Sequence, residues 1–192
     1  MVNQPILIYT DGSSLRNPGS SGLAYIIRYM DDLNDGSMPK YTDIECAKGY
    51  RLSTNNRMEM MAAIEALGQT LSLIQTNPNF STVRQVDLYS DSEYFCKAIN
   101  NKWIEKWQQN GWMTSGFRGQ QPTAIKNKDL WEKIITLQNQ FRSMNITLTI
   151  SWVKGHNGDE YNEKCDKMAV DASNNNASNI DEIYESLAMT KK

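Results

Sequence analysis

Two short stretches of this chain show the same order of residue types, and each ends in an aspartate. Residues 8–11 read IYTD and residues 88–91 read LYSD. If the two are neighbouring strands in matched register, Asp11 and Asp91 project together at one edge of a sheet, where open α/β sheets place their ligand sites. For either aspartate alone, a turn or helix-capping role is the more common explanation.

Two further acids belong to predicted helices. Glu59 lies in the first turn of an amphipathic helix, directly before Met60 of its apolar face, at the border between core and solvent. Asp166 lies on the last predicted helix among apolar and charged positions. Each has an ordinary alternative: Glu59 could serve the helix dipole, and Asp166 could be a solvated charge.

Carboxylates gathered on rigid elements repel one another unless cations neutralise them, and hard oxygen ligands select Mg²⁺ or Mn²⁺. Two such ions stabilise the attacking and leaving oxygens of a phosphoryl displacement. The chain has a single histidine and no closely paired cysteines, which disfavours zinc chemistry. It also contains no GxSxG, Walker A or dinucleotide-binding motif. The pattern therefore favours metal-assisted phosphoryl chemistry.

The elements that position these residues belong to a chain of ordinary globular composition. Its 192 residues, 40% of them hydrophobic and 22% charged, fit one domain. No apolar run is long enough for a membrane helix, and no targeting signal precedes the first strand, so we expect a cytoplasmic protein. The three widely spaced cysteines indicate reduced thiols. A net charge of −2 gives no general sign of a nucleic-acid partner.

Periodicity predicts strands that give way to alternating helices and strands, which favours an α/β fold with a mixed sheet. Residues 102–126 show weak helical turns, and an Asn-rich stretch follows the last helix. A short appended helix over 180–189, capped by Ser178 or Asn179, is also expected. The predicted strands are 5–11, 23–30, 44–52, 83–91 and 146–153, and the main helices start near 56, 92, 130 and 159.

The ordered motifs resemble those of the type 1 ribonucleases H. They are YTDGSSLRNPG (9–19), TNNRMEMMAAIEAL (54–67), LYSDSEYF (88–95) and WVKGHNGDEYNEKCDKMA (152–169), and the resemblance covers about residues 5–172. It implies a five-stranded sheet in the order 3-2-1-4-5 with helices on both faces. It also implies endonucleolytic cleavage of the RNA strand of RNA–DNA hybrids, with two Mg²⁺ ions (or Mn²⁺), leaving 5′-phosphate and 3′-hydroxyl ends.

The resemblance also implies roles for individual residues. Asp11, Glu59, Asp91 and Asp166 match the metal-ligating carboxylates. His156 matches a loop histidine that assists proton movement. Histidine as a residue type can exchange protons near neutral pH, and Gly155 and Gly158 would give the loop freedom to approach a bound phosphate, although a plain surface histidine is the ordinary alternative. The implied hybrid contacts are Asn17, Asn55 and Asn56 in the minor groove, Thr54 and Asn127 at a DNA-strand phosphate, and Trp103 beside the DNA strand. Without the family, the polar residues are turn or cap residues, and Trp103 is as well explained by core packing.

The family comparison divides the chain into a catalytic domain over 1–173, with a handle-like substrate-binding segment at 102–126, and an Asn-rich tail over 174–192. Polar linkers seldom carry core contacts, so truncation after about Asn174 is expected to leave cleavage largely intact. Three features depart from the family pattern: Glu93 one turn after Asp91, a longer connection over 31–43 together with the extra tail, and glutamines where many relatives carry lysines, at 108–112.

Two alternatives stay open. The chain could be another nuclease or resolvase with the same acidic cluster, or a silent hybrid-binding module. The motif around His156 argues against the first, and the retention of four mutually repelling acids argues against the second. The expected partner is the hybrid, with no membrane, no obligate protein partner and a monomeric state.

Overall fold

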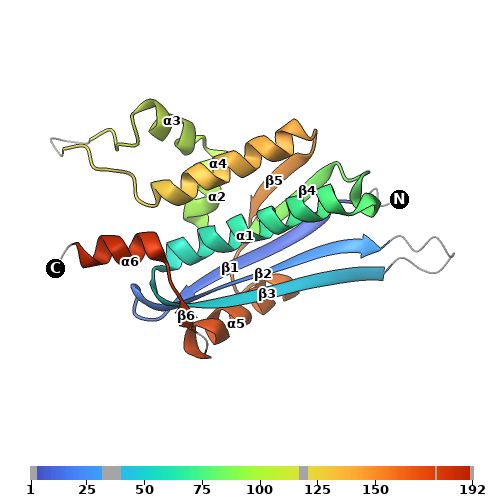
Figure 1. Ribbon diagram of the computed structural model, residues 1–192, viewed down its shortest axis with the longest axis horizontal. Coiled ribbons are helices and arrows are strands. Elements are labelled where there is room, and N and C mark those ends of the chain that lie inside the picture. Colours follow the sequence, from blue (N-terminus) through green and yellow to red (C-terminus); the bar gives the residue numbers. More distant parts are fainter. Residues whose placement is uncertain (1–3, 32–39, 117–120, 176, 191–192) are drawn as a thin grey trace.

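The computed structural model describes residues 4–31, 40–116, 121–175 and 177–190. Its elements follow one another as a strand-rich first half and a mixed second half (Figure 1). In chain order they are β1 (Ile6–Ser14), β2 (Gly19–Asp31), β3 (Lys40–Ser53), α1 (Asn55–Thr76), a 3₁₀ turn (Pro78–Phe80), β4 (Gln85–Ser90), α2 (Glu93–Asn100), α3 (Trp103–Gln109), α4 (Lys128–Ser143), β5 (Thr147–Trp152), α5 (Glu160–Asn175), β6 (Ala177–Asn179) and α6 (Glu182–Met189).

The strands form one mixed sheet in the order β5-β4-β1-β2-β3-β6. β1, β2 and β3 pair antiparallel, whereas β4 runs parallel to β1 and β5 runs parallel to β4. The expected α/β fold and the order of its five strands are therefore confirmed. The expected number of strands is wrong by one, because β6 pairs parallel with the outer edge of β3.

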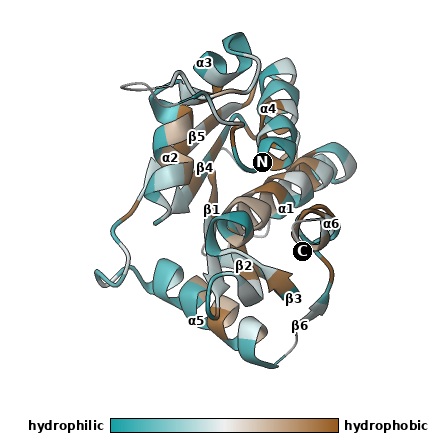
Figure 2. Ribbon diagram, turned by 90° about the vertical axis from the view of Figure 1, so that its left-hand side faces the viewer, coloured by the Kyte–Doolittle hydropathy of each residue, from teal (hydrophilic) through white to brown (hydrophobic). Residues whose placement is uncertain are grey.

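Helices cover both faces of this sheet. α1 and α4 lie against one face and α5 lies against the other, as the view along the sheet shows (Figure 2). The strands β2 and β3 are longer than the sequence predicts, and most of the connection between them, residues 32–39, lies outside the described residues. Within the described residues, no helix has both the length and the apolar character that crossing a membrane requires.

α1 shows how local sequence sets an element that the site depends on. Thr54 caps its first turn, with the hydroxyl accepting a hydrogen bond from the backbone N–H of Arg57. The helix ends at Thr76, two residues before Pro78, which cannot continue it. Its buried face carries the small and apolar residues Met60, Ala63, Leu67 and Leu71.

The core between α1, α2, α4 and the sheet is rich in aromatic residues. Trp131, Phe95 and Phe141 are among the largest fully buried side chains, and the rings of Phe95 and Trp131 stack with centroids 6.2 Å apart. The three cysteines are free thiols, of which Cys96 and Cys165 are buried. This core fixes the helices whose first turns face the site.

The C-terminal segment, residues 177–189, differs from the expected polar tail. α5 continues to Asn175, into the Asn-rich stretch, and β6 follows almost at once. The expected helix is present as α6, but its N-cap is Asp181 and not Ser178 or Asn179. The expectation that this tail makes few contacts is wrong, because Asp181 and Glu185 are both buried against the domain.

Candidate active site

The sheet brings Asp11 and Asp91 to adjacent positions. In the parallel pair of β1 and β4, Tyr9 lies beside Tyr89 and Thr10 lies beside Ser90. The repeated residue pattern therefore reflects the matched register of the two strands, and Asp11 and Asp91 follow at neighbouring positions. Successive strands lie about 4.8 Å apart, so the backbone of the sheet sets the spacing of these two acids.

Glu59 reaches the same place from α1. A Cβ atom added at Gly12 would lie 2.2 Å from the backbone nitrogen of Glu59, so the first turn of α1 rests directly on β1 at this glycine. Two hydrogen bonds hold the Glu59 carboxylate: Asn55 Nδ2 donates to Oε1 at 2.7 Å, and the Ser92 hydroxyl donates to Oε2. Ser92 is also the N-cap of α2, so Glu59 is tied to the turn that follows Asp91.

Asp11 is the most buried of the four acids. Its exposed fraction is 5%, and its Oδ1 accepts a hydrogen bond of 2.7 Å from the backbone N–H of Gly12. The pKa of Asp11 is raised to about 8: burial is the main cause and the charges of Asp91, Asp166 and Glu59 add to it, whereas the hydrogen bond from Gly12 opposes the rise. All three partner acids are therefore close enough to act on Asp11.

The pKa of Glu59 is raised as well. Burial is the main cause and the charge of Asp91 adds to it, whereas the hydrogen bonds from Ser92 and Asn55 oppose the rise. Ionising all of these acids together is therefore costly without a counter-charge.

Asp166 and His156 complete the site from α5 and the loop before it. The Nδ1 atom of His156 lies 3.9 Å from Oδ2 of Asp166. The His156 side chain is 81% exposed and sits on a left-handed backbone, with φ of 53°. It stands at the rim of the site, where it can meet a bound ligand without first being uncovered.

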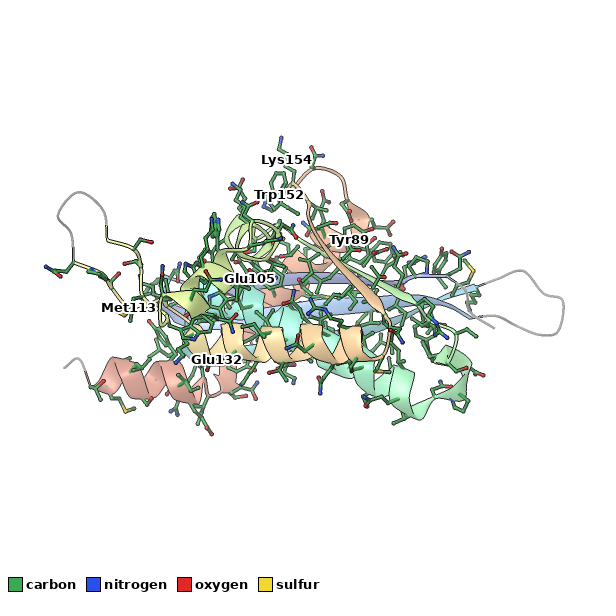
Figure 3. The ribbon with its side chains drawn as sticks, turned by 90° about the horizontal axis from the view of Figure 1, so that it is seen from above. Tyr89, Glu105, Met113, Glu132, Trp152 and Lys154 are labelled. Atoms are coloured by element: carbon green, nitrogen blue, oxygen red, sulfur yellow. The ribbon has the colours of Figure 1, made fainter. Side chains whose placement is uncertain are left out.

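The loop after β5 presses on Asp91. A Cβ atom at Gly155 would lie 2.7 Å from Oδ2 of Asp91, so a larger residue here would displace the Asp91 carboxylate. The indole of Trp152 donates a 3.0 Å hydrogen bond to the backbone carbonyl of Asp91. Figure 3 shows Trp152 and Lys154 projecting outward together from this end of the sheet.

The donor set suits a hard divalent cation. It consists of carboxylates alone, and a cation would relieve the repulsion that raises the pKa of Asp11. Among the described residues, no three acidic, histidine or cysteine side chains converge closely enough as they stand to hold an ion between them. Ligation therefore requires the side chains of Asp11, Glu59, Asp91 and Asp166 to rotate toward one another.

A groove of about 1030 Å³ lies beside the site and is lined by several of the expected substrate contacts. Asn17, Thr54, Asn56 and Asn127 all line it. Asn55 does not, because its side chain donates to Glu59 while its backbone N–H donates to Asn17 Oδ1 at 3.1 Å.

Trp103 lies apart from this groove, on α3. Its ring is 6.2 Å from that of Trp107, which in turn lies 5.5 Å from buried Trp131. Trp103 is only partly buried, so it packs at the margin of the aromatic core and keeps one side accessible. Its position is compatible both with core packing and with contact to the DNA strand, the two roles that the sequence leaves open.

Sequence reasoning missed four residues that organise the site and the groove. Ser92 holds Glu59, and Arg57 forms buried ion pairs with Asp129 and Asp181. The Ser92 position could have been noticed as a helix cap after a strand. The partners of Arg57 lie 72 and 124 residues away in the chain, so no local pattern announces them.

Comparison with known proteins gives a consistent result. The chain matches the family model described as RNase H over residues 3–174. It is 40% identical over 180 residues to "Ribonuclease H" of Rippkaea orientalis, covering 94% of this chain and 92% of that protein. It is 37% identical over 179 residues to "Ribonuclease HI" of Synechocystis, covering 93% and 94%.

Solved structures resemble the fold at lower identity. The crystal structure of LC9-RNase H1, a type 1 RNase H with the type 2 active-site motif, matches with a TM-score of 0.63 and 23% identity, covering 95% of this chain and 80% of that one. LC11-RNase H1, solved in complex with an RNA/DNA hybrid, matches with a TM-score of 0.55 and 20% identity, covering 88% and 96%. These likenesses support the fold.

Proposed function

Because this chain belongs to the ribonuclease H family, we propose that it hydrolyses the RNA strand of RNA–DNA hybrids internally, leaving 5′-phosphate and 3′-hydroxyl ends. The observation that carries the proposal is the coupling of four carboxylates around buried Asp11. Such a cluster has little use without cations, and its donors are those that Mg²⁺ and Mn²⁺ prefer.

Asp11, Glu59, Asp91 and Asp166 are proposed to hold two divalent ions. When bound, these ions supply charge neutralisation at the scissile phosphate and activation of the attacking water. The protein contributes the positioning. The sheet register sets Asp11 beside Asp91, and hydrogen bonds from Asn55 and Ser92 hold Glu59.

His156 is proposed to move a proton at the leaving oxygen of the RNA strand. Its exposure at the rim allows it to reach a bound phosphate, and its Nδ1 atom lies 3.9 Å from Oδ2 of Asp166. An acid–base group of this kind accelerates cleavage, but cleavage does not depend on it entirely.

The groove beside the site is proposed to receive the hybrid. Asn17, Asn55 and Asn56 would meet 2′-hydroxyls and base edges in the minor groove, which is where these groups are displayed. Thr54 and Asn127 would bind a phosphate of the DNA strand. Trp103, on the handle-like segment, would pack near that strand.

The experiment is cleavage of uniformly labelled hybrid, single-stranded RNA, duplex RNA and duplex DNA with Mg²⁺, with Mn²⁺ and with chelator. We expect internal cuts in the RNA of the hybrid alone, no cutting with chelator, and product ends that a 5′-phosphate-dependent exonuclease degrades. Cutting of duplex DNA would favour another nuclease of the same superfamily. Hybrid binding without cutting would favour a silent binding module.

The oligomeric state and the location in the cell stay predictions. Light scattering of the purified protein, and fractionation of cells that express it, would measure each directly.

A further inference from the structure

A buried arginine connects the C-terminal segment to the groove. Arg57, in the first turn of α1, is 3% exposed and carries its charge inside the protein. Its guanidinium donates to both oxygens of Asp181, at 2.6 and 2.9 Å, and to both oxygens of Asp129, at 3.0 and 2.8 Å. A further donor reaches Asn127 Oδ1 at 3.4 Å. The fork of Arg57 is fully used, so its orientation is set by the partners around it.

Asp181 is the partner that the C-terminal segment supplies. It is 4% exposed, and its Oδ2 also accepts a 2.6 Å hydrogen bond from the hydroxyl of Ser53 at the end of β3. Its Oδ1 caps α6 by accepting from the backbone N–H of Tyr184. One carboxylate thus joins β3, α1 and α6. A buried pair of this kind is costly to break, because the remaining charge is left without a partner.

Arg57 in turn contacts both residues that are proposed to hold a DNA-strand phosphate. Its backbone N–H donates to the hydroxyl of Thr54, and its guanidinium donates to the carbonyl oxygen of Asn127. The second contact fixes the orientation of the Asn127 amide, whose Nδ2 donates to the sulfur of Met60 at 3.9 Å, so that one N–H group is left for another acceptor. The guanidinium therefore orients Asn127, whereas the contact with Thr54 is the backbone cap of α1, and Arg57 does not itself offer a free charge to the ligand.

The same segment builds a wall of the groove. Ile183, Tyr184 and Leu187 of α6 line it opposite Asn17, Thr54 and the residues that lead into α4. In Figure 1, α6 lies beside the starts of both α1 and α4, and Figure 2 shows the same neighbourhood from the side. The segment therefore bounds the groove and also reaches the network beneath it.

We propose that Asp181 and the groove-lining residues of α6 (Ile183, Tyr184 and Leu187) form part of the hybrid-binding apparatus, with Asp181 as a positioning residue that acts through the guanidinium of Arg57 on Asn127. Asp181 does not touch the substrate. It keeps the guanidinium oriented so that Asn127 is held in place beside Thr54, the cap of α1, and the two side chains present a fixed site to one backbone phosphate, while α6 bounds the groove. This inference rests on the proposed function.

The first test is steady-state cleavage of hybrid by Asp181→Asn in the full chain. The variant keeps the size of the side chain and removes its charge, so Arg57 loses a charge-assisted partner and is free to turn. We expect KM to rise about tenfold while kcat at saturating hybrid stays within about twofold. An unchanged KM, a lower KM, or a fall confined to kcat would overturn the proposal.

The matched control is Glu185→Gln. Glu185 is also buried on α6, but it pairs with Arg51 at 2.6 Å and is not among the residues that line the groove. We expect this variant to lower the unfolding temperature without raising KM. If it raised KM as much as Asp181→Asn, the effect would come from general docking of the segment, and the positioning role of Asp181 would be wrong.

A second experiment identifies which phosphate of the DNA strand the site binds. Binding in Ca²⁺ is measured with hybrids that carry one neutral methylphosphonate at successive positions of the DNA strand. We expect the wild type to lose affinity at one position, and Asp181→Asn to lose that sensitivity, because its phosphate site is no longer ordered. A scan that is the same in both proteins contradicts the inference, and a merely structural role would leave the scan unchanged.

The role of Asp181 and the proposed function can be tested separately. If Asp181→Asn does not unfold cooperatively, Ser53→Ala removes one hydrogen bond from Asp181 and should give a smaller rise in KM at constant kcat; no rise would overturn the proposal. If the wild type binds hybrid but does not cut it, the proposed function fails while the methylphosphonate scan still decides the role of Asp181.

Discussion

Asp11 is the acid of the site on which burial, a hydrogen bond and neighbouring charges act together. It is buried, it accepts a hydrogen bond from Gly12, and three other carboxylates act on it. Its pKa of about 8 means that the folded protein holds a proton there that the unfolded chain has released above its ordinary value of 3.8. The arrangement opposes folding at neutral pH unless a cation is bound, and it therefore links stability to cation binding.

The pH dependence of stability without metal follows from this shift. A raised carboxyl pKa stabilises the folded state fully below about pH 4, and this stability is lost as pH rises to about 8. We expect the free energy of unfolding in chelator to fall by about 3 kcal/mol or more between pH 5 and 9. Asp11→Asn should remove most of the fall, leaving the part due to Glu59, whose pKa is also raised. Urea titrations at several pH values measure this, and a wild-type curve that rises over the range contradicts it.

Kinetic measurements can distinguish the roles of Asp91 and His156. Asp91→Asn keeps the side-chain shape and removes charge needed for metal, so cleavage should be nearly abolished while hybrid still binds. His156→Ala should lower the cleavage rate about 10²–10⁴-fold, which is the range that one acid–base group contributes. Single-turnover rates and binding in Ca²⁺ provide both readings. A histidine variant as inactive as the aspartate variant would show that the assigned roles are wrong.

At the scale of elements, the contact between β1 and α1 sets the relation between Asp11 and Glu59. The strand can approach the helix backbone only because residue 12 has no side chain. The helix is held at this point by its cap at Thr54 and by the buried charges around Arg57. A small change in this contact therefore moves one acid against another.

Gly12→Ala should separate the two elements. The new Cβ would lie 2.2 Å from the nitrogen of Glu59 and 2.6 Å from the carbonyl carbon of Met58, and neither backbone atom can give way cheaply. We expect a loss of about 3 kcal/mol in stability and a large loss of cleavage. Gly68→Ala is the control in the same helix: nothing lies within 4 Å of its added Cβ, so stability should stay the same or rise by up to about 1 kcal/mol. Urea unfolding compares the two, and equal effects would refute the close-contact argument.

Which elements the sequence could predict depends on how local their causes are. The strand pair at Asp11 and Asp91 and the amphipathic face of α1 rest on patterns within a few residues, and the structure confirms both. β6 and the buried contacts of Asp181 could not be predicted, because an Asn-rich stretch looks like a linker and the partners Arg57 and Ser53 lie more than 120 residues away. The cap of α6 is a different case: Asp181 accepts a hydrogen bond from the backbone N–H of Tyr184, three residues on, which is a local signal that the sequence does contain. The chemical roles of the acids stay predictions.

At the scale of the whole molecule, binding must work against a net charge of −2. Affinity for nucleic acid comes largely from counterion release, with a slope of about 0.9 per phosphate neutralised on B-form DNA. Two glutamines, Gln108 and Gln109, end α3, where the resemblance to type 1 ribonucleases H leads us to expect lysines. We therefore expect weaker hybrid binding and a shallower dependence on salt than in basic relatives.

Changing Gln108 and Gln109 to lysine should tighten hybrid binding at low salt and steepen the slope by up to about two units, with unchanged cleavage chemistry. The measurement is affinity in Ca²⁺ across a salt series. The control places the same two charges on exposed Gln75 and Gln140, near the far ends of α1 and α4. Equal slopes in both variants would mean that α3 does not touch the hybrid, and Trp103 would be withdrawn as a contact.

The short strand β6 has a consequence beyond the groove. β3 forms an edge of the main sheet, and an edge with unpaired backbone groups is a template for pairing with another chain. Charged side chains at Lys40, Asp43, Glu45 and Lys48 discourage such pairing along most of β3, but Gly49 and Tyr50 carry no charge, and β6 covers them. The segment that orders the groove therefore also guards the protein against edge-to-edge aggregation. A chain shortened before Ala177 would self-associate through this exposed edge in concentrated solution.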